Sequence, residues 1–337
     1  MKVKLAIPWS VLCSILVILA VTLLMACTPK PSSSDEYVLE WASFQNASHL
    51  ETMALQKNFF DQVNAKSKGE LTIKFRGGPE VIAPPDLGGA VQKGIVDIGM
   101  APCGFYEAIA PGVGAAVLSN VTVQKERTGG AFDYFVEIHN KGGLTYLGRP
   151  FFAPKGFFYV YLNKKVATPR DLAGLKIGGT TAGRAPAIGW GANFVSLQMD
   201  EYFTSMESGL VDGVNSSPLV TWVSSGSHEV TKYIIDHPFY QSSLMTFMNL
   251  NSWNKLPKHL QKLMLDIMAE AEDKGADEFE KINNESMQKV TAAGVEKITF
   301  SSQDAKWFID TAFNAGWAYQ QERFPDVTPK LKELLSK

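Results

Sequence analysis

The side chains that could bind a metal are few and poorly spaced for that task. The five histidines are His49, His139, His228, His237 and His259. None is paired at the i, i+4 spacing or lies near a cysteine, and His228-Glu229 lacks the second histidine of a zinc-protease helix. We therefore expect surface or core histidines, with no metal site and no cofactor.

Signatures of nucleophilic catalysis and nucleotide binding are also missing. The sequence has no Gly-x-Ser-x-Gly elbow. The glycine-rich stretch 178–183 is followed by Arg184-Ala185, where a phosphate-binding loop needs Lys and then Ser or Thr. No local signal links Cys103 to a His or Asn, so we expect a packed or pocket-lining thiol. The chain is therefore not expected to be an enzyme.

Aromatic and small polar residues recur instead where predicted strands end. Each aromatic residue alone is more often part of a core. Ligand pockets, however, are largely apolar with a few placed polar groups, so the recurrence favours a binding cleft. The candidate ligand-binding residues from this pattern are Phe44, Asn46, Phe105, Phe158, Tyr159, Thr180, Arg184, Asn215, Ser217 and Trp222.

A short phrase occurs twice, as Gly94-Ile95-Val96-Asp97 and as Gly209-Leu210-Val211-Asp212. Each copy follows a predicted helix, which the glycine would end, and predicts an apolar strand that leads into a polar loop. Ligands of open α/β sheets bind beyond the carboxyl ends of strands, so two such units predict two lobes that face one cleft. A four-residue similarity also arises by chance.

The remaining pattern alternates strands and helices, which is typical of α/β layering. We expect a helix that starts with the capping box Ser48-x-x-Glu51 and runs to about residue 67, and a loop over 178–184. A helix over 257–294 would have about 37 residues and a length of roughly 55 Å, so it would brace both lobes. Two helices broken near Gly275 are the alternative.

Length and charge leave the class of protein open but exclude some partners. The 337 residues suit one large or two medium domains, and 45% are apolar. The formal net charge is −2, from 32 basic and 34 acidic residues, and no basic run is interleaved with aromatics. We therefore expect no nucleic-acid partner.

The first 27 residues differ in composition from the rest. Lys2 and Lys4 precede an uncharged stretch that ends in Leu24-Met25-Ala26-Cys27. This arrangement resembles a bacterial lipoprotein signal, so we expect a signal peptide over 1–26, lipid attachment at Cys27 and a Pro/Ser-rich tether over 27–36. A permanent transmembrane helix is the alternative. The expected location is the periplasm or the cell surface, on a membrane anchor.

Several segments resemble the solute-binding proteins of tripartite ATP-independent periplasmic (TRAP) transporters. Residues 167–177 (ATPRDLAGLKI) are similar to the family segment "tPeDLkGlKiR", and residues 201–213 (EYFTSMESGLVDG) to "EvytALqtGvvDG". Residues 252–257 (SWNKLP) match "aWnkLP", and residues 94–99 match "GtvDig". The matches follow the family order from about residue 37 to 322.

The resemblance implies a two-lobed α/β fold of the periplasmic-binding-protein (Venus-flytrap) type, with crossed hinge strands and a long C-terminal helix spanning both lobes. Lobe I would comprise 37–157 plus 247–290, and lobe II 158–246 plus 291–337. Such a receptor captures a small organic solute by closing, and delivers it to a permease of one small and one large membrane subunit. An ion gradient drives that transport.

The departures from the family pattern bear on the solute. The family arginine that pairs with a solute carboxylate corresponds to Gly178, and a second arginine to Phe158 or Tyr159. The family asparagine corresponds to Ser217, and a pocket aromatic to Met199. The resemblance therefore leaves open a carboxylate held by Arg184, with an exposed Arg184 as the alternative, and a neutral or aromatic solute.

Two other functions compete with a TRAP receptor. The same binder could serve an ATP-driven importer or a sensor, and a neighbouring gene for a large permease without an ATPase would decide between them. A surface lipoprotein enzyme would need a water-activating constellation, and the sequence contains none that we recognise.

Overall fold

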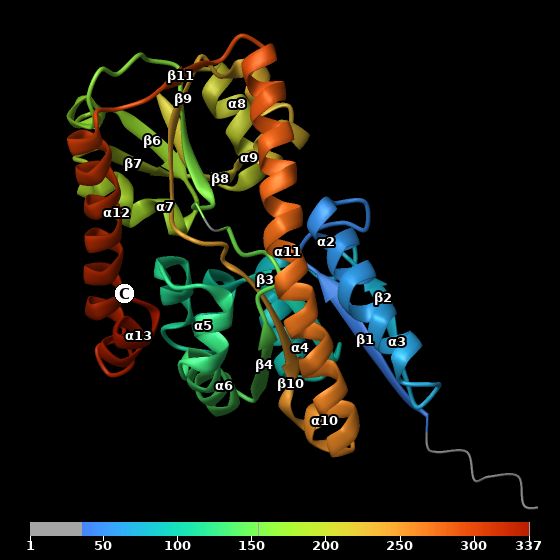
Figure 1. Ribbon diagram of the computed structural model, residues 1–337. Coiled ribbons are helices and arrows are strands. Elements are labelled where there is room, and N and C mark those ends of the chain that lie inside the picture. The colour runs from blue at the N-terminus through green and yellow to red at the C-terminus, as the bar shows by residue number, and fades with distance from the viewer. Residues whose placement is uncertain (1–35, 154, 337) are drawn as a thin grey trace, which may run out of the picture. The chain divides into compact units, whose positions relative to one another are not determined.

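The computed structural model describes residues 36–153 and 155–336, and residues 38–337 form one compact unit. The predicted signal peptide, the lipid site at Cys27 and nearly all of the tether lie outside the described residues. Within the described part, no helix combines the length and apolar character that crossing a membrane requires. The compact unit contains two α/β lobes, each built on its own sheet (Figure 1).

Lobe I is built on a five-stranded mixed sheet in the order β2-β1-β3-β10-β4. Strand β3 runs parallel to β1 and antiparallel to β10. The indole of Trp41 on β1 is fully buried and stacks on Phe60, with ring centroids 4.2 Å apart. The strands are β1 (Tyr37–Ser43), β2 (Leu71–Gly77), β3 (Ile98–Pro102), β4 (Leu144–Gly148) and β10 (Leu244–Asn249). The helices are α2 (Leu50–Leu55), η1 (Gln56–Phe60), α3 (Asp61–Lys66), α4 (Leu87–Gln92), α5 (Val123–Thr128), α6 (Ala131–Lys141) and α10 (Leu250–Lys255).

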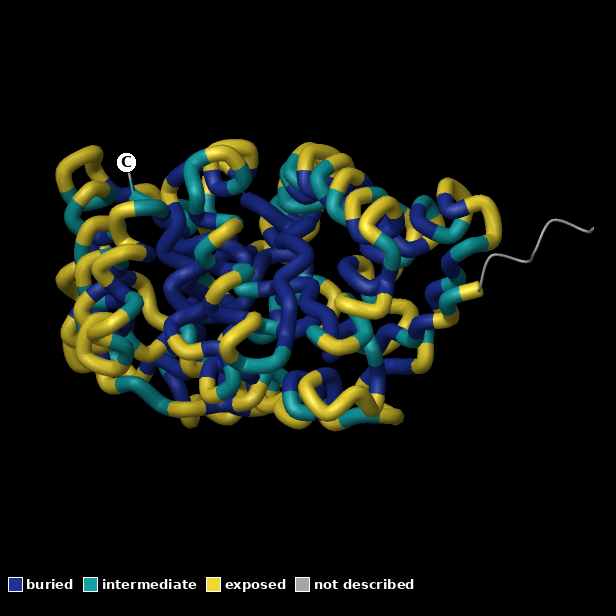
Figure 2. Tube along the Cα trace, turned by 90° about the horizontal axis from the view of Figure 1, so that it is seen from below, coloured by how far each residue is buried: buried dark blue, intermediate teal, exposed yellow. Residues whose placement is uncertain are grey.

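Lobe II is built on a six-stranded mixed sheet in the order β11-β9-β5-β8-β6-β7. Strand β6 is parallel to both neighbours, whereas β5 is antiparallel to β8 and β9. Buried residues follow the two sheets, and exposed residues form the outer shell (Figure 2). The strands are β5 (Phe158–Leu162), β6 (Lys176–Gly179), β7 (Asn193–Ser196), β8 (Gly213–Pro218), β9 (Tyr233–Phe239) and β11 (Glu296–Ile298). The helices are α7 (Thr181–Gly189), α8 (Tyr202–Glu207) and α9 (Leu219–Ser224).

The chain crosses between the lobes on two adjacent segments, from β4 to β5 and from β9 back to β10. They bond to each other, because the Phe157 N–H donates to the Tyr240 carbonyl at 2.9 Å, and Gln241 exchanges two hydrogen bonds with the main chain of Ala153. Crossing segments of this kind were expected from the family resemblance. The two crossing segments form the hinge between the lobes.

The long helix is confirmed as one unbroken element, α11 (Lys258–Ala292) of 35 residues, and it runs along both lobes (Figure 1). A break at Gly275 does not occur. Gly275 serves a different purpose, because a Cβ there would collide with the carbonyl oxygen of Pro150 in the hinge. The glycine lets the helix pass close to the crossing chain.

Buried ion pairs attach the middle of α11 to lobe I. The Arg127 guanidinium donates to the Glu272 carboxylate, and the main-chain N–H of Arg149 donates to the same carboxylate at 2.7 Å. The Arg149 guanidinium, fully buried, pairs with Glu126 and donates to the carbonyls of Ala116 and Ser242. The network joins α5, the end of β4 and α11.

The repeated phrase has the same structure in both lobes, but it forms the turn before each strand and not the strand itself. Gly94 and Gly209 share φ +71°, and Ile95 and Leu210 are each 53% exposed. The strands begin only at Ile98 and Gly213, because the aspartate between turn and strand bonds to a neighbouring strand. The Asp97 carboxylate accepts from the Glu40 N–H at 2.8 Å, and the Asp212 carboxylate from the Lys176 N–H at 2.9 Å.

Two local predictions are corrected. The capping box does not form, because the Ser48 hydroxyl donates to Asn46 and the Glu51 carboxylate turns inward toward His49, which is the N-cap residue of α2. The predicted loop over 178–184 is shorter, because β6 continues to Gly179 and α7 begins at Thr181.

The C-terminal helices, which the predicted boundary 291–337 assigns to lobe II, contact both lobes. Helix α12 (Ser302–Arg323) packs on α7 of lobe II and also on η4 (Val113–Leu118) of lobe I. Helix α13 (Thr328–Leu335) packs on η4 and α6, and the Asn120 N–H donates to the Leu335 carbonyl at 2.9 Å. The chain thus crosses the two lobes again along α12.

We expect Gly275→Ala to lower the free energy of unfolding by about 1–3 kcal/mol, through overpacking against Pro150. Alanine normally stabilises a helix interior by about 1 kcal/mol over glycine, so the sign is diagnostic. Gly89→Ala in α4 is the control, since a Cβ there meets nothing within 4 Å. Chemical denaturation measures both, and a stabilised Gly275→Ala variant would contradict the close approach.

Candidate functional site

One cavity lies between the lobes and is lined by lobe I, lobe II, the crossing segments and α12. The volume open to the centre of a water-sized molecule in this cavity is about 120 Å³. At roughly 10–15 Å³ per water, that corresponds to a solute of on the order of ten non-hydrogen atoms. Most of the lining is apolar, as is usual for small-molecule sites.

The lobe I wall follows the ends of β1 and β3, as the sequence pattern predicted. Phe44 comes directly after β1, and Phe105 follows β3, in η3 (Cys103–Phe105). Their rings meet edge to face with centroids 6.4 Å apart. Cys103 also lines the cavity, but burial raises the pKa of its thiol to about 12. It is therefore a pocket-lining thiol and not a nucleophile.

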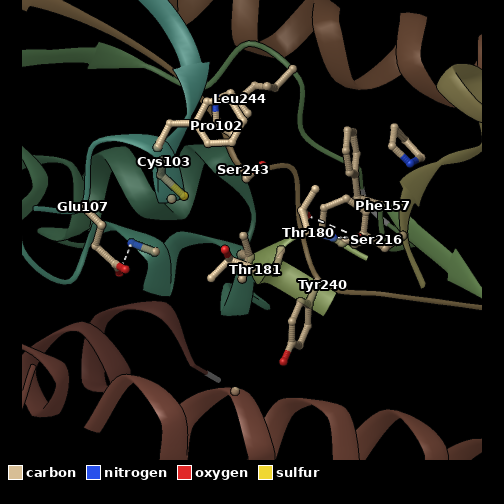
Figure 3. A pocket seen from close by; sticks show the side chains of 18 of the residues that line it. Pro102, Cys103, Glu107, Phe157, Thr180, Thr181, Ser216, Tyr240, Ser243 and Leu244 are labelled. Atoms are coloured by element: carbon tan, nitrogen blue, oxygen red, sulfur yellow. Dashed lines mark hydrogen bonds between the residues drawn. The ribbon is translucent and has the colours of Figure 1, made fainter. Parts of the chain in front are cut away.

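The lobe II wall is formed by the end of β6, the start of α7 and the middle of β8 (Figure 3). The Ser216 hydroxyl oxygen accepts from the Thr180 N–H at 2.7 Å and lies 2.9 Å from the Tyr202 hydroxyl. Gly179 is required here, because a Cβ would lie 2.6 Å from the Ser216 oxygen. Thr180, Thr181, Ser216 and the partly buried Met199 face the cavity.

The crossing segments and α12 close the remaining sides. Phe157, Phe158 and Tyr240 line the cavity from the crossing segments, and the Tyr240 hydroxyl donates to the Ala312 carbonyl at 2.8 Å. From α12 come Gly316, Tyr319 and Gln320. Gly316 leaves room for the Tyr240 hydroxyl, which a Cβ would displace.

Among the described residues, the charged side chains that line the cavity are the carboxylates of Glu51 and Glu107. Glu107 accepts from the Arg323 guanidinium at 2.6 Å and from the Gly114 N–H at 3.1 Å. The Glu51 carboxylate lies 2.5 Å from Nδ1 of His49. No Lys, Arg or His of the described part lines the cavity, so a bound carboxylate has no guanidinium partner there.

The space beside Gly178 is filled. Gly178 is buried, and a Cβ there would lie 2.5 Å from Leu197 and 3.2 Å from Val211. Phe158, at one of the two candidate positions for the second arginine, is an apolar wall of the cavity. The space that a guanidinium would need at Gly178 therefore belongs to the lobe II core.

Five of the predicted ligand-binding residues line the cavity: Phe44, Phe105, Phe158, Thr180 and Met199. The other six, Asn46, Tyr159, Arg184, Asn215, Ser217 and Trp222, are not part of its lining. Two of these six residues are sequence neighbours of residues that do line the cavity. Successive strand residues point to opposite faces, so Phe158 and Ser216 face the cavity while Tyr159 and Ser217 do not.

The remaining predicted residues have other roles. Trp222 is fully buried and stacks on Tyr161 with centroids 3.9 Å apart. Asn215 donates to the Gly183 carbonyl at 2.9 Å. Asn46 is exposed. Arg184 is exposed on α7, 5.8 Å from the centre of the Phe194 ring, so it has no contact with the cavity.

Sequence reasoning did not select Glu51, Glu107, Tyr240, Tyr319 or Gln320 as site residues. Glu107 and Gln320 lie more than two hundred positions apart, and only the fold brings them to one cavity. Glu51 had been assigned to a helix cap. Gly316 lies one turn before Gln320, and a glycine within a helix can mark the close approach of another segment. Glycine also occurs in helices for many other reasons, so it does not identify a site by itself.

His139 is a core histidine that supports one wall of the cavity. His139 is fully buried; its Nδ1 lies 2.6 Å from the Phe135 carbonyl and its Nε2 3.1 Å from the Tyr106 hydroxyl. Burial lowers its pKa to about 4, so it is neutral and supports the Phe105 loop through Tyr106. Among the described residues, no group of three His, Cys, Asp or Glu side chains could hold a metal ion.

The fold and the cavity define a two-lobed solute-binding protein of the periplasmic type. The chain matches the family model "Bacterial extracellular solute-binding protein, family 7" (DctP) over residues 41–322. The protein therefore belongs to that family of TRAP-type solute receptors, which are not enzymes.

Known relatives are distant in sequence but similar in fold. A monocarboxylate 2-oxoacid-binding periplasmic protein of Nostoc sp. is 22% identical over 313 residues, which cover 84% of this chain and 81% of the relative. A TRAP periplasmic solute-binding protein of Desulfovibrio salexigens, with bound orotic acid, superposes with a TM-score of 0.76 at 19% identity, covering 89% of this chain and 97% of that one.

A second solved structure, the DctP7 extracytoplasmic solute receptor of Bordetella pertussis that binds pyroglutamic acid, gives a TM-score of 0.73 at 19% identity. It covers 89% of this chain and 99% of that one. These likenesses confirm the two-lobed fold that the sequence motifs predicted. At such identities they do not assign a solute.

We expect Gly178→Arg to destabilise the protein by more than about 3 kcal/mol, because the side chain overpacks Leu197 and buries an unpaired charge. The Gly178→Arg variant should not gain a site that binds a carboxylate. Gly104→Arg is the control, since Gly104 is exposed and a Cβ there meets nothing within 4 Å. Thermal and chemical unfolding measure the loss, and a fully stable Gly178→Arg variant would show that the cavity can still accept the family arginine.

Proposed function

We propose that this protein is the extracytoplasmic receptor of a TRAP importer, which captures one small organic solute in the cavity between its lobes. The observation that carries the proposal is the cavity itself, since residues of both lobes and of α12 line it together. A solute that contacts both lobes gains affinity only when they are closed, so binding shifts the open–closed equilibrium. A permease of two membrane subunits, driven by an ion gradient, then takes the solute from the closed receptor.

The solute has a compact and largely apolar body, and a guanidinium ion pair does not hold it. Phe44, Phe105 and Phe158 supply aromatic walls, while Gly178 and Phe158 stand where the family places arginines. The 2-oxoacid, orotic acid and pyroglutamic acid of the relatives are small organic acids of a size that suits the cavity. An acid bound here therefore needs neutral hydrogen-bond donors.

The receptor is tested by ligand-dependent thermal unfolding of the full chain in detergent, against small organic acids and their neutral analogues. A receptor ligand at a hundredfold excess over its Kd stabilises the folded state by about 2.7 kcal/mol. We expect one chemical class to give such shifts, and NMR to show the solute unchanged after incubation. Conversion of the solute would instead indicate an enzyme.

The matched variants are Phe105→Ala, which removes a cavity wall, and Phe194→Ala, which removes an equally half-buried ring outside the cavity. Phe105→Ala should weaken the stabilising solute at least about tenfold, because a buried aromatic contact is worth more than 1.4 kcal/mol. Phe194→Ala should leave the affinity within twofold. Equal affinities in both variants would place the solute elsewhere.

Residues 1–26 act as a signal peptide in the proposed function, and a lipid on Cys27 tethers the receptor by residues 27–36. The basis is the run Leu24-Met25-Ala26-Cys27 and the Pro/Ser-rich stretch after it. We expect Cys27→Ser to move the protein from the membrane fraction to the soluble exported fraction. Retention of the variant in the membrane would favour an uncleaved transmembrane helix.

A further inference from the structure

Glu51 is a buried carboxylate in the cavity wall that accepts no hydrogen bond from the described residues. It lies in the first turn of α2 and is 5% exposed. Its Oε2 is enclosed 2.5 Å from Nδ1 of His49, but neither of these two atoms has a hydrogen-bond partner. Oε1 also lacks a hydrogen bond and, unlike Oε2, is not enclosed, so a molecule in the cavity can reach the carboxylate there. A carboxylate removed from water without hydrogen bonds is unfavourable, so Glu51 requires a partner.

The neighbouring histidine does not supply a compensating positive charge. The side-chain nitrogen of Gln45 lies 3.2 Å from Nε2 of His49. An amide nitrogen can only donate, so with the amide oriented in this way Nε2 is an acceptor and the imidazole carries a single proton, on Nδ1. His49 is then neutral, and Glu51 keeps its full negative charge.

The other carboxylate of the cavity differs in this respect, because it is already paired. Glu107 accepts from the Arg323 guanidinium at 2.6 Å and from the Gly114 N–H at 3.1 Å. No Lys, Arg or His of the described residues lines the cavity to balance Glu51. Glu51 therefore gives the enclosed space a negative potential, which a bound cation would neutralise.

The apolar part of the lining also suits an organic cation. The face of an aromatic ring is negative, so it attracts a cation and repels an anion, most strongly where water is excluded. The same rings bury the apolar body of a solute. Six aromatic residues line the cavity: Phe44, Phe105, Phe157, Phe158, Tyr240 and Tyr319.

A second, smaller cavity does not offer an alternative place for such a solute. Glu51 also lines this cavity, together with Ala54 and with Phe279 of α11. The volume open to the centre of a water-sized molecule there is about 30 Å³. That is room for roughly two or three waters. A solute that pairs with Glu51 therefore fits the cavity between the lobes.

Resting on the receptor function above, we propose that the solute is a small organic amine, bound as its ammonium ion, which donates a hydrogen bond to Oε1 of Glu51. The aromatic residues enclose its apolar body. Because Glu51 belongs to lobe I, whereas Thr180 and Ser216 line the cavity from lobe II, such a solute contacts both lobes when they close. Glu51 is then the residue that selects a cation and rejects an anion.

The charge of the solute is tested with two series of molecules that share an apolar body and differ in charge. One series is 2-phenylethylamine, 2-phenylethanol and phenylacetate, and the other is 3-methylbutylamine, 3-methylbutan-1-ol and 3-methylbutanoate. All have about six to ten non-hydrogen atoms, which the cavity can hold. Each is titrated by calorimetry at pH 7 into the full chain in detergent, against a blank of detergent alone. We expect at least one ammonium to bind at least tenfold more tightly than its alcohol and its carboxylate.

Glu51→Gln removes the charge and keeps the size of the side chain. It should weaken binding of that ammonium at least tenfold and change the affinity of the alcohol less than twofold, because the alcohol makes no ion pair. Glu70→Gln is the matched control. Glu70 also lies beside a histidine, 2.8 Å from Nε2 of His259, but outside the cavity, so this variant should change the ammonium affinity less than twofold.

Thermal unfolding without solute gives a second readout. Removing an unpaired buried charge relieves an unfavourable interaction, so Glu51→Gln should raise the midpoint of thermal unfolding of the solute-free protein. Glu70→Gln should not raise it. A lower midpoint for Glu51→Gln would show that the carboxylate already has a structural partner, and would overturn the proposal.

Tighter binding of an alcohol or a carboxylate than of its ammonium would overturn the amine as solute while leaving the receptor function intact. Equal ammonium affinities of Glu51→Gln and the unmodified protein would do the same. If no probe binds, the ammonium class is wrong. The wider thermal panel described above then decides whether the receptor function fails as well.

Discussion

The two lobes depend on one helix that passes both of them without a break. Helix α11 is held to lobe I by buried ion pairs, in which Glu272 accepts from the Arg127 guanidinium and from the Arg149 main chain. Removing one partner of a buried pair typically costs about 3–5 kcal/mol, because the other charge is left buried and unpaired, so loss of either residue would disturb this attachment. In lobe II, Val290 of α11 packs in the apolar core instead. Gly275, against the Pro150 carbonyl, lets the helix lie close to the hinge between these two attachments.

Within that frame, the cavity between the lobes has no cationic side chain in its described lining. Leu197 and Val211 occupy the space beside Gly178, so no open space for a larger side chain lies there. Removing an arginine from a buried carboxylate site is costly unless other donors replace it. The N-terminus of α7, which no side chain caps, lies just beyond Gly179 on the same strand–helix unit.

The sequence predicted the layering, the long helix and the location of the cavity at strand ends, because those follow from periodicity and from residues that stop helices. It did not resolve which strand residues face the cavity. Side chains alternate along a strand, and the phase depends on pairing with neighbours, so Tyr159 was selected together with Phe158, and Ser217 in place of Ser216, although only Phe158 and Ser216 face the cavity. Gln320 and Glu107 could not be joined from sequence, because α12 reaches lobe I only in the folded chain.

The repeated Gly-[Ile/Leu]-Val-Asp turn gives the two walls a shared geometry, and the residues that follow it give them different chemistry. Each aspartate accepts a hydrogen bond from a main-chain N–H of a neighbouring parallel strand, Glu40 of β1 or Lys176 of β6, and so fixes the turn against that strand. The loop after Asp97 and β3 presents apolar Phe105, whereas β8 after Asp212 presents Ser216 beside the α7 amides. In the proposed receptor function, closure brings the aromatic wall of lobe I against a solute that lies on lobe II. The aromatic wall then gives the closed state its additional affinity.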